Sequence, residues 1–283
     1  MEDFDSNPLK QYFRQPGLTI KLPSMGRFQD PQNVKFTATG EVAILPMRAA
    51  DELLMKSPDA LMSGLAIESA IKSCVPDVKD PRQLPTPDVD AILLAIRAAT
   101  YHEAMEVGAK CPNCGHENSY GFDVNSILET ITPLEEEYPV RLNDELVVYL
   151  RPFNFEASTK LNLTIFQETR KMQVLDAQED ISDLDKQHAI NETHKRLSHM
   201  NIQMIADSVE KVVIPSGTIT NRKHISEFIH QTSSENINLI QEKIKEINIS
   251  GVEKDHPVEC AKCHHEWKTT IEFDPSNFFG HSS

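Results

Sequence analysis

Apolar residues are sparse at the start of the chain and become periodic further along. Residues 1–30 are rich in Pro, Asn, Gln and Gly, and their apolar positions are isolated. We predict an extended N-terminal arm over residues 1–30, which is either disordered or ordered by contact with a partner. From Asn33 the run VKFTATGEVAIL alternates around Gly40. This alternation predicts a hairpin with strands near residues 34–37 and 41–45.

Two proline-containing signals mark helix starts in the next part of the chain. Ser57 followed by Pro58 is an N-cap and first-turn pair, and it predicts a helix that ends at about Cys74. Thr86 and Pro87 repeat the signal and predict a second helix over residues 87–107. Its apolar positions have helical spacing and should supply the core of the N-terminal part: Ile92, Leu93, Ile96 and Ala99.

The next region combines short strands with longer helical periodicities. Strands are predicted near residues 120–122 and at 145–150, where alternate residues share one face. Beyond residue 154, two apolar stripes predict an antiparallel helical hairpin around an acidic loop near residues 177–185. The stripes are Leu161, Ile165, Thr169 and Met172 on the first helix, and Ile190, Leu197, Met200 and Met204 on the second.

A last helix is predicted after residue 232. Thr232 and Glu235 match a capping box, and Gly251 follows the end of the helical pattern. We interpret its apolar face as core, because a single row of isoleucines must be covered and the same chain is the nearest cover. The row consists of Ile237, Ile240, Ile244 and Ile247.

Composition and charge narrow the classes of function. A hydrophobic content of 39% allows a buried core, and no stretch approaches the ~20 apolar residues that cross a bilayer. The net charge of -15 disfavours nucleic acid, because counterion release needs clustered Lys and Arg. Acidic runs at residues 135–137 and 176–185 are solvated or, alternatively, dock a basic partner. The N-terminus lacks a secretion signal, so we expect a reducing cytoplasm without disulfides.

Four of the five cysteines stand in two C-x-x-C pairs, Cys111 with Cys114 and Cys260 with Cys263. A tight C-x-x-C turn presents two thiolates to one ion, and two such turns complete the tetrahedron that zinc prefers. Strand-like sequence follows each pair, as in the halves of a zinc ribbon. About 145 residues separate the halves, so the predicted ribbon is split. One structural zinc per chain would tie the middle of the chain to its end.

Other interpretations of the cysteines remain open. In one alternative, a histidine replaces one sulfur as a metal ligand, namely His116, His264 or His265. In others, the cysteines form a redox dithiol or bind no metal. Cys74 is interpreted as a buried small hydrophobe. Four thiolates would leave no open position for a catalytic zinc. The sequence has no phosphate-binding glycine loop, no H-E-x-x-H and no nucleophile elbow, so we expect neither an enzyme nor a small-molecule substrate.

A series of short motifs carries a family resemblance. They are KLPSMGRF at residues 21–28, EVAILPM at 41–47 followed by Asp51 and Glu52, Ile96 with Arg97, the first cysteine pair, and Arg151 with Pro152. In this order the chain resembles the baseplate hub proteins of T-even-type contractile-tailed bacteriophages. The resemblance implies a non-enzymatic role in the central hub, as a retained subunit or an assembly factor, with other baseplate or tail proteins as partners. It implies a location in the host cytoplasm during assembly or in the virion.

Together these patterns predict an α+β fold with small antiparallel strands, a split four-cysteine zinc ribbon and an inserted helical region. The predicted organisation is an arm over residues 1–30, an α+β region with the first knuckle over 31–153, the helical insertion over 154–250, and the second knuckle with a tail over 251–283. The alternative function is a stand-alone cytoplasmic zinc-ribbon protein with a regulatory or redox role.

Overall fold

The computed structural model describes residues 7–101, 103–177 and 183–271. Its mixed α+β fold with small antiparallel sheets confirms the predicted fold class. The predicted C-terminal tail and most of the acidic loop near residues 177–185 lie outside the described residues. No helix in the described ranges has the length and apolar character needed to cross a membrane.

The N-terminal part packs helices around a two-stranded sheet. Strand β1 (Leu18–Ile20) pairs antiparallel with β2 (Val42–Ile44). The short 3-10 helices are η1 (Pro8–Tyr12) and η2 (Pro81–Gln83). The α-helices are α1 (Ala49–Met55), α2 (Pro58–Met62), α3 (Leu65–Cys74), α4 (Thr86–Thr100) and α5 (Val124–Leu128). Every residue of α4 from 91 to 96 is buried, so this helix is the centre of the N-terminal core.

The predicted hairpin over residues 34–45 is wrong in its pairing. Gly40 makes the expected turn, with a φ of 78° that suits glycine, but β2 pairs with β1 from further upstream. This pairing draws part of the predicted arm into the fold, where Ile20 and Leu22 are buried. Alternation identified β2 correctly, but a local turn carries no information about a partner strand outside the turn.

One predicted helix ends at Cys74 as expected but is divided in two, and another ends earlier than its sequence pattern suggests. The Ser57 side chain accepts a hydrogen bond from the Ala60 N–H, as expected of an N-cap, but Gly64 then divides the helix into α2 and α3. Gly64 has a φ of 74°, and a Cβ there would lie 2.8 Å from Thr159 of the next helical region. Helix α4 ends at Thr100, and residues 105–110 form a strand instead of its last turns.

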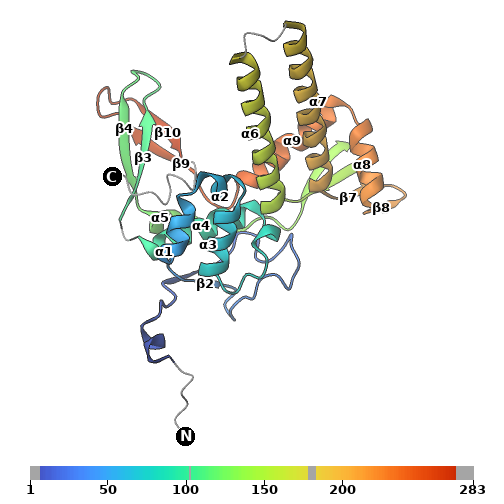
Figure 1. The fold of residues 1–283 in the computed structure, drawn as a ribbon. Coiled ribbons are helices and arrows are strands. Elements are labelled where there is room, and N and C mark those ends of the chain that lie inside the picture. Colours follow the sequence, from blue (N-terminus) through green and yellow to red (C-terminus); the bar gives the residue numbers. More distant parts are fainter. Residues whose placement is uncertain (1–6, 102, 178–182, 272–283) are drawn as a thin grey trace.

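Two hairpins of the predicted ribbon lie side by side (Figure 1), although they are far apart in sequence. Strand β3 (Met105–Lys110) pairs with β4 (Glu117–Phe122), which contains the predicted strand near 120–122. Strand β9 (Asp255–Glu259) pairs with β10 (Glu266–Thr270). Tyr120 joins the hairpins, because its hydroxyl donates to the Glu259 carbonyl at 2.9 Å and its ring meets Trp267 edge-on at 6.0 Å. Trp267 therefore packs within the ribbon.

A four-stranded antiparallel sheet has the order β5, β6, β7, β8. Its strands are β5 (Tyr138–Asn143), β6 (Leu146–Leu150), β7 (Val209–Ile214) and β8 (Gly217–Ile219). Strand β6 matches the strand predicted at 145–150, with Val148 and Leu150 buried. The other three strands were not predicted. The sheet takes strands from both sides of residue 154, where the helical insertion was expected to begin.

Four helices accompany this sheet. They are α6 (Phe155–Ala177), α7 (Asp183–Ser208), α8 (Arg222–Gln231) and α9 (Ser234–Ile249). The predicted helical hairpin is α6 with α7, which projects from the rest of the molecule (Figure 1). In α9, Ile240, Ile244 and Ile247 are buried, which confirms the interpretation of the isoleucine row as core. The N-cap of α9 is Ser233 and not the predicted Thr232, which ends α8.

Buried apolar side chains form two clusters. The first belongs to the N-terminal part and also includes Val252 and Ile271 from the C-terminal segment. The second fills the space between the four-stranded sheet and α7, α8 and α9. The chain therefore returns after residue 250 to pack on its own N-terminal part, and this return brings the second cysteine pair to the first.

Candidate metal centre

Both C-x-x-C pairs form the turns at the tips of the two ribbon hairpins. The four sulfurs of Cys111, Cys114, Cys260 and Cys263 all lie within 4.8 Å of one another. Two close approaches join the hairpins, at 3.7 Å from Cys111 Sγ to Cys263 Sγ and 3.7 Å from Cys114 Sγ to Cys260 Sγ. The fold thus brings together all four predicted cysteines, while Cys74 is buried in the N-terminal core.

The two turns have the same backbone hydrogen bonds. In the first, the Cys111 N–H donates to the His116 carbonyl and the Gly115 N–H donates to the Cys111 carbonyl, both at 2.9 Å. In the second, the Cys260 N–H donates to the His265 carbonyl and the His264 N–H donates to the Cys260 carbonyl, both at 3.0 Å. Gly115 and His264 both have positive φ, 69° and 56°. A histidine tolerates this left-handed conformation better than most side chains do. Backbone hydrogen bonds within each turn therefore define its shape.

The spacing of the sulfurs fits a tetrahedral zinc ion. Zinc–thiolate bonds of about 2.3 Å in a regular tetrahedron place neighbouring sulfurs about 3.8 Å apart. The two approaches of 3.7 Å between the hairpins agree with this value and are far longer than a disulfide bond of about 2.05 Å. The residues present thus fit a divalent metal with soft, sulfur-rich coordination.

The pKa values of the clustered thiols are shifted in opposite directions. Burial opposes ionisation of Cys260, but backbone N–H donors from Cys263 and Lys262 and side-chain hydrogen bonds from Cys114 and Cys263 together lower its pKa to about 6. The N–H of His265 is the main cause of the lowered pKa of Cys263. Cys114 accepts from the His116 N–H, yet burial and the neighbouring sulfurs raise its pKa to about 12. Four adjacent thiolates need a positive charge at their centre, which a divalent metal would supply.

Two asparagines that the sequence analysis did not identify complete the surroundings of the sulfurs. The Asn113 amide donates to Cys263 Sγ at 3.7 Å, and the Asn118 amide donates to Cys260 Sγ at 3.8 Å. Asn118 also accepts from the Ala261 N–H at 3.0 Å, so it links the two hairpins. Such outer donors orient ligands and stabilise the charge on sulfur.

The three candidate histidines lie outside the sulfur cluster. Within the described ranges, the group of side chains close enough to share an ion consists of the four cysteines. His264 instead contacts Glu259, at 2.5 Å from its Nδ1 to Glu259 Oε1. His265 stacks against Trp267 with ring centroids 6.1 Å apart. A four-sulfur site of this kind leaves no vacant position for water, as is usual for structural zinc.

Fold and site together define an α+β protein whose distant segments are joined through a split four-cysteine ribbon. The chain belongs to the family described as T4 bacteriophage base plate protein, whose family model matches residues 18–280. No curated protein matches the chain, and no solved structure matches it. The family membership confirms the resemblance that the ordered short motifs suggested.

Proposed function

We propose that this chain is a non-catalytic structural or assembly component of the central hub of a contractile phage baseplate, stabilised by one zinc ion held by Cys111, Cys114, Cys260 and Cys263. The observation that carries the proposal is the family match over residues 18–280. The four-sulfur geometry supports the zinc.

The zinc would act through folding and not through chemistry. Its ligands close a loop that contains the four-stranded sheet and helices α6 to α9. A structural zinc contributes on the order of 10 kcal/mol at neutral pH. Closing the loop would hold the C-terminal segment against the N-terminal core and fix one shape of the surface that other baseplate proteins contact.

The partners would be other tail or baseplate proteins. A net charge of -15 opposes contact with nucleic acid, so we expect no measurable DNA binding at physiological salt. Neighbours that contact the acidic runs at 135–137 and 176–185 should present Lys and Arg, and their association should slow as salt rises.

Mass spectrometry of purified particles beside infected-cell lysate tests the hub role. A retained subunit is expected in both samples, and an assembly factor is expected in the lysate together with other hub proteins. If the chain copurifies with no tail component, the hub role is excluded. A dithiol that cycles between oxidised and reduced forms as metal is lost would instead favour the stand-alone redox alternative.

Metal analysis tests the zinc separately. We expect one zinc per chain in reduced protein, and cobalt substitution should give the absorption of tetrahedral thiolate coordination. A stoichiometry near zero in carefully reduced protein would exclude the zinc site, whatever the outcome for the hub.

A further inference from the structure

A cleft far along the chain from the cysteines joins two motifs that the metal centre does not use. Phe28, at the end of the run over residues 21–28, and Arg151, which follows β6, both line a cavity of about 290 Å³. The same two residues line an adjoining cavity of about 370 Å³. Phe28 has a φ of 65°, which is unfavourable for a bulky side chain. Strained backbone of this kind is found preferentially at functional sites.

Buried polar atoms in the walls of this cleft lack hydrogen-bond partners. Ser208, at the end of α7, lines the first cavity and is 2% exposed. Its Oγ has no hydrogen-bond partner among the described residues. Gln29 lines the second cavity, and its buried Nε2 also lacks a partner there. A buried polar atom without a partner costs free energy, so both atoms indicate a ligand with acceptor oxygens.

Two cations line the cleft without an ion pair of their own within the described ranges, Arg151 and Lys160, although Glu156 and Asp207 line the first cavity and Asp30 and Glu210 line the second. Arg151 donates through Nε and Nη2 to the backbone carbonyl of Asp207, at 3.2 and 3.1 Å. In the described part of the chain, neither Arg151 nor Lys160 has a carboxylate within ion-pair distance. Burial lowers the pKa of Arg151, and the nearby Arg222 lowers it further, against the weaker opposing effects of Glu210 and Asp207. An anion in the cleft would remove this repulsion.

The two acidic residues that line the first cavity each have another polar neighbour. Asp207 Oδ1 accepts from the Gln203 amide at 3.1 Å. Glu156 lies close enough to Arg82 to raise the pKa of that guanidinium, although Glu68 has the largest effect on it. The first turn of α6 also lines the cavity, with Asn154 as its cap for the Ala157 N–H at 2.9 Å. The N-terminal end of a helix carries a partial positive charge, which favours an anion.

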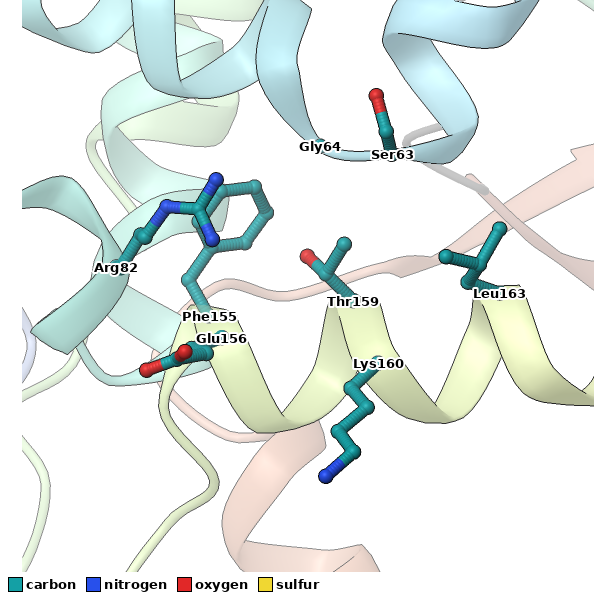
Figure 2. A pocket seen from close by; sticks show the side chains of 8 residues that line it. All are labelled: Ser63, Gly64, Arg82, Phe155, Glu156, Thr159, Lys160 and Leu163. Carbon is teal, nitrogen blue, oxygen red and sulfur yellow. The ribbon is translucent and has the colours of Figure 1, made fainter.

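A neighbouring cavity shows why Lys160 belongs to the cleft. This cavity, of about 240 Å³, lies between the Ser63–Gly64 turn and α6 (Figure 2). Two cations line it, Arg82 and Lys160, and Arg82 is already paired with Glu68 Oε2 at 2.7 Å. Figure 2 shows the Lys160 side chain directed away from Ser63 and Gly64. Lys160 lines both cavities, and the direction of its side chain leaves the ammonium group available to a ligand in the cleft.

We propose that this cleft binds a carboxylate carried by a partner polypeptide, with Arg151, Lys160 and the Ser208 hydroxyl as its donors. The partner rests on the proposed baseplate role, whereas the carboxylate rests on the cleft alone. An aspartate or glutamate side chain, or a C-terminal carboxylate, would supply two acceptor oxygens to a guanidinium edge and a hydroxyl. The occupied cleft would bridge the N-terminal loop, α6 and the end of α7, and so make the relative position of these elements sensitive to the partner.

The test uses the zinc-loaded full chain and a carboxylate probe, N-acetyl-glutamate amide. Amide signals of Ser208 and Ala157 are followed by NMR while the probe is added. We expect saturable shifts with the carboxylate probe. The neutral N-acetyl-glutamine amide should bind with an affinity about ten-fold lower or more. Equal shifts with both probes would overturn the proposal. Saturation by inorganic phosphate but not by the carboxylate probe would also overturn it, because the ligand would then be a free anion.

Two variants separate binding from folding. Arg151→Gln should lower the affinity for the carboxylate probe by about ten-fold or more. Arg141 is exposed on β5, and Arg141→Gln should leave this affinity unchanged. Ser208→Ala should also lower the affinity for the probe. It should not lower the melting temperature, because it removes a hydroxyl that has no hydrogen-bond partner among the described residues. Unchanged probe binding in both cleft variants would reject the site.

The outcome is distinguishable from that of the baseplate role. Probe binding by a chain that copurifies with no tail protein would leave the carboxylate site intact and exclude the hub as its setting. Association with hub proteins without saturable probe binding would support the hub role and exclude the carboxylate site.

Discussion

At the scale of single residues, the two knuckles are asymmetric in burial in the same way. The first cysteine of each pair, Cys111 or Cys260, is buried, whereas Cys114 is exposed and Cys263 is partly exposed. Each knuckle thus contributes one buried and one more exposed cysteine to the cluster, and loss of either buried cysteine should have the same consequence.

Serine at Cys111 or at Cys260 should destabilise the chain about equally, because either change removes one corner of the same tetrahedron. Metal analysis and thermal unfolding measure the effect, and both variants should lose zinc. The control is Cys74→Ala, which removes a buried sulfur outside the cluster and should keep one zinc per chain. If one knuckle tolerates serine and the other does not, the two pairs do not share an ion.

Asp88 is a fully buried carboxyl that accepts two hydrogen bonds from Ser24. The Ser24 N–H donates to Oδ1 at 2.7 Å and its hydroxyl to Oδ2 at 2.5 Å. Burial raises the pKa of Asp88 to about 7, although the bonds from Ser24 favour the charged form. Between about pH 4 and 7 the folded state therefore holds a proton that the unfolded chain has released. Stability from this group is greatest below pH 4 and declines as pH rises to 7.

Asp88→Asn should remove this pH dependence. From pH 6 to pH 8, the unfolding free energy of the natural chain should fall by about 1.4 kcal/mol relative to the variant. Denaturant unfolding of zinc-loaded protein measures the difference. Asp123→Asn is the control, because hydrogen bonds from Asn125 and Ser126 lower the pKa of that carboxyl and leave it ionised throughout this range. Parallel profiles for the natural chain and Asp88→Asn would contradict the prediction.

At the scale of elements, caps decide where helices begin. The Ser233 hydroxyl accepts from the Asn236 N–H at the start of α9, whereas Thr232 ends α8. Ser233→Ala should therefore cost about 1 kcal/mol of unfolding free energy, the usual cost of losing an N-cap. Thr232→Ala is the matched control and should cost less. Chemical denaturation of both variants compares them, and the opposite order would restore the capping box predicted from the sequence.

The helical hairpin is joined by a polar network instead of a broad apolar seam. Glu168 of α6 is buried and contacts Arg196 Nη2 at 2.7 Å and the Thr193 hydroxyl at 3.0 Å on α7. The bond from Arg196 is the main cause that lowers the pKa of Glu168 to about 2. The network thus persists at neutral pH and weakens only as pH falls from about 4.5 toward 2.

Glu168→Ala should increase amide hydrogen exchange along α6 and α7 at neutral pH. The variant leaves Arg196 and Thr193 without their shared acceptor, which removes a link between the two helices. Hydrogen-exchange mass spectrometry measures this, with Glu192→Ala as the control because its pair with Lys195 lies within α7. Equal exchange in both variants would show that apolar contacts suffice to hold the hairpin.

The elements that could be predicted from the sequence are those with local signals. The Ser57 cap, the isoleucine row of α9 and the two C-x-x-C turns each depend on residues a few positions apart. Pairings across long distances could not be predicted, because β1 meets β2 and β7 meets β6 only after the intervening chain has folded. The same limit applies to the site. Its four sulfurs follow from spacing, but nothing local indicates that Asn118 faces Cys260.

At the scale of the whole molecule, the cysteine cluster connects two hairpins that bury few apolar side chains of their own. Strands β9 and β10 are mostly exposed or half-buried, with Thr269 as their buried residue. An isolated two-stranded hairpin is marginally stable in water. Val252 and Ile271, on either side of this hairpin, are buried in the first hydrophobic cluster. The hairpin is therefore held at its base by apolar packing and at its tip by the sulfurs.

Removal of zinc by a chelator under reducing conditions should release the two ribbon hairpins together and leave the second hydrophobic cluster folded. Amides of residues 105–122 and 255–270 should lose exchange protection in parallel, because the tip of each hairpin holds the other through the shared ion. Amides of β6, whose Val148 and Leu150 are buried in the second cluster, serve as the internal control and should stay protected. Hydrogen exchange before and after chelation, followed by re-addition of zinc, measures both regions in one sample. Release of only one hairpin would show that the other is stable without the ion, and equal loss at β6 would show that zinc supports the entire fold and not the junction between its distant segments.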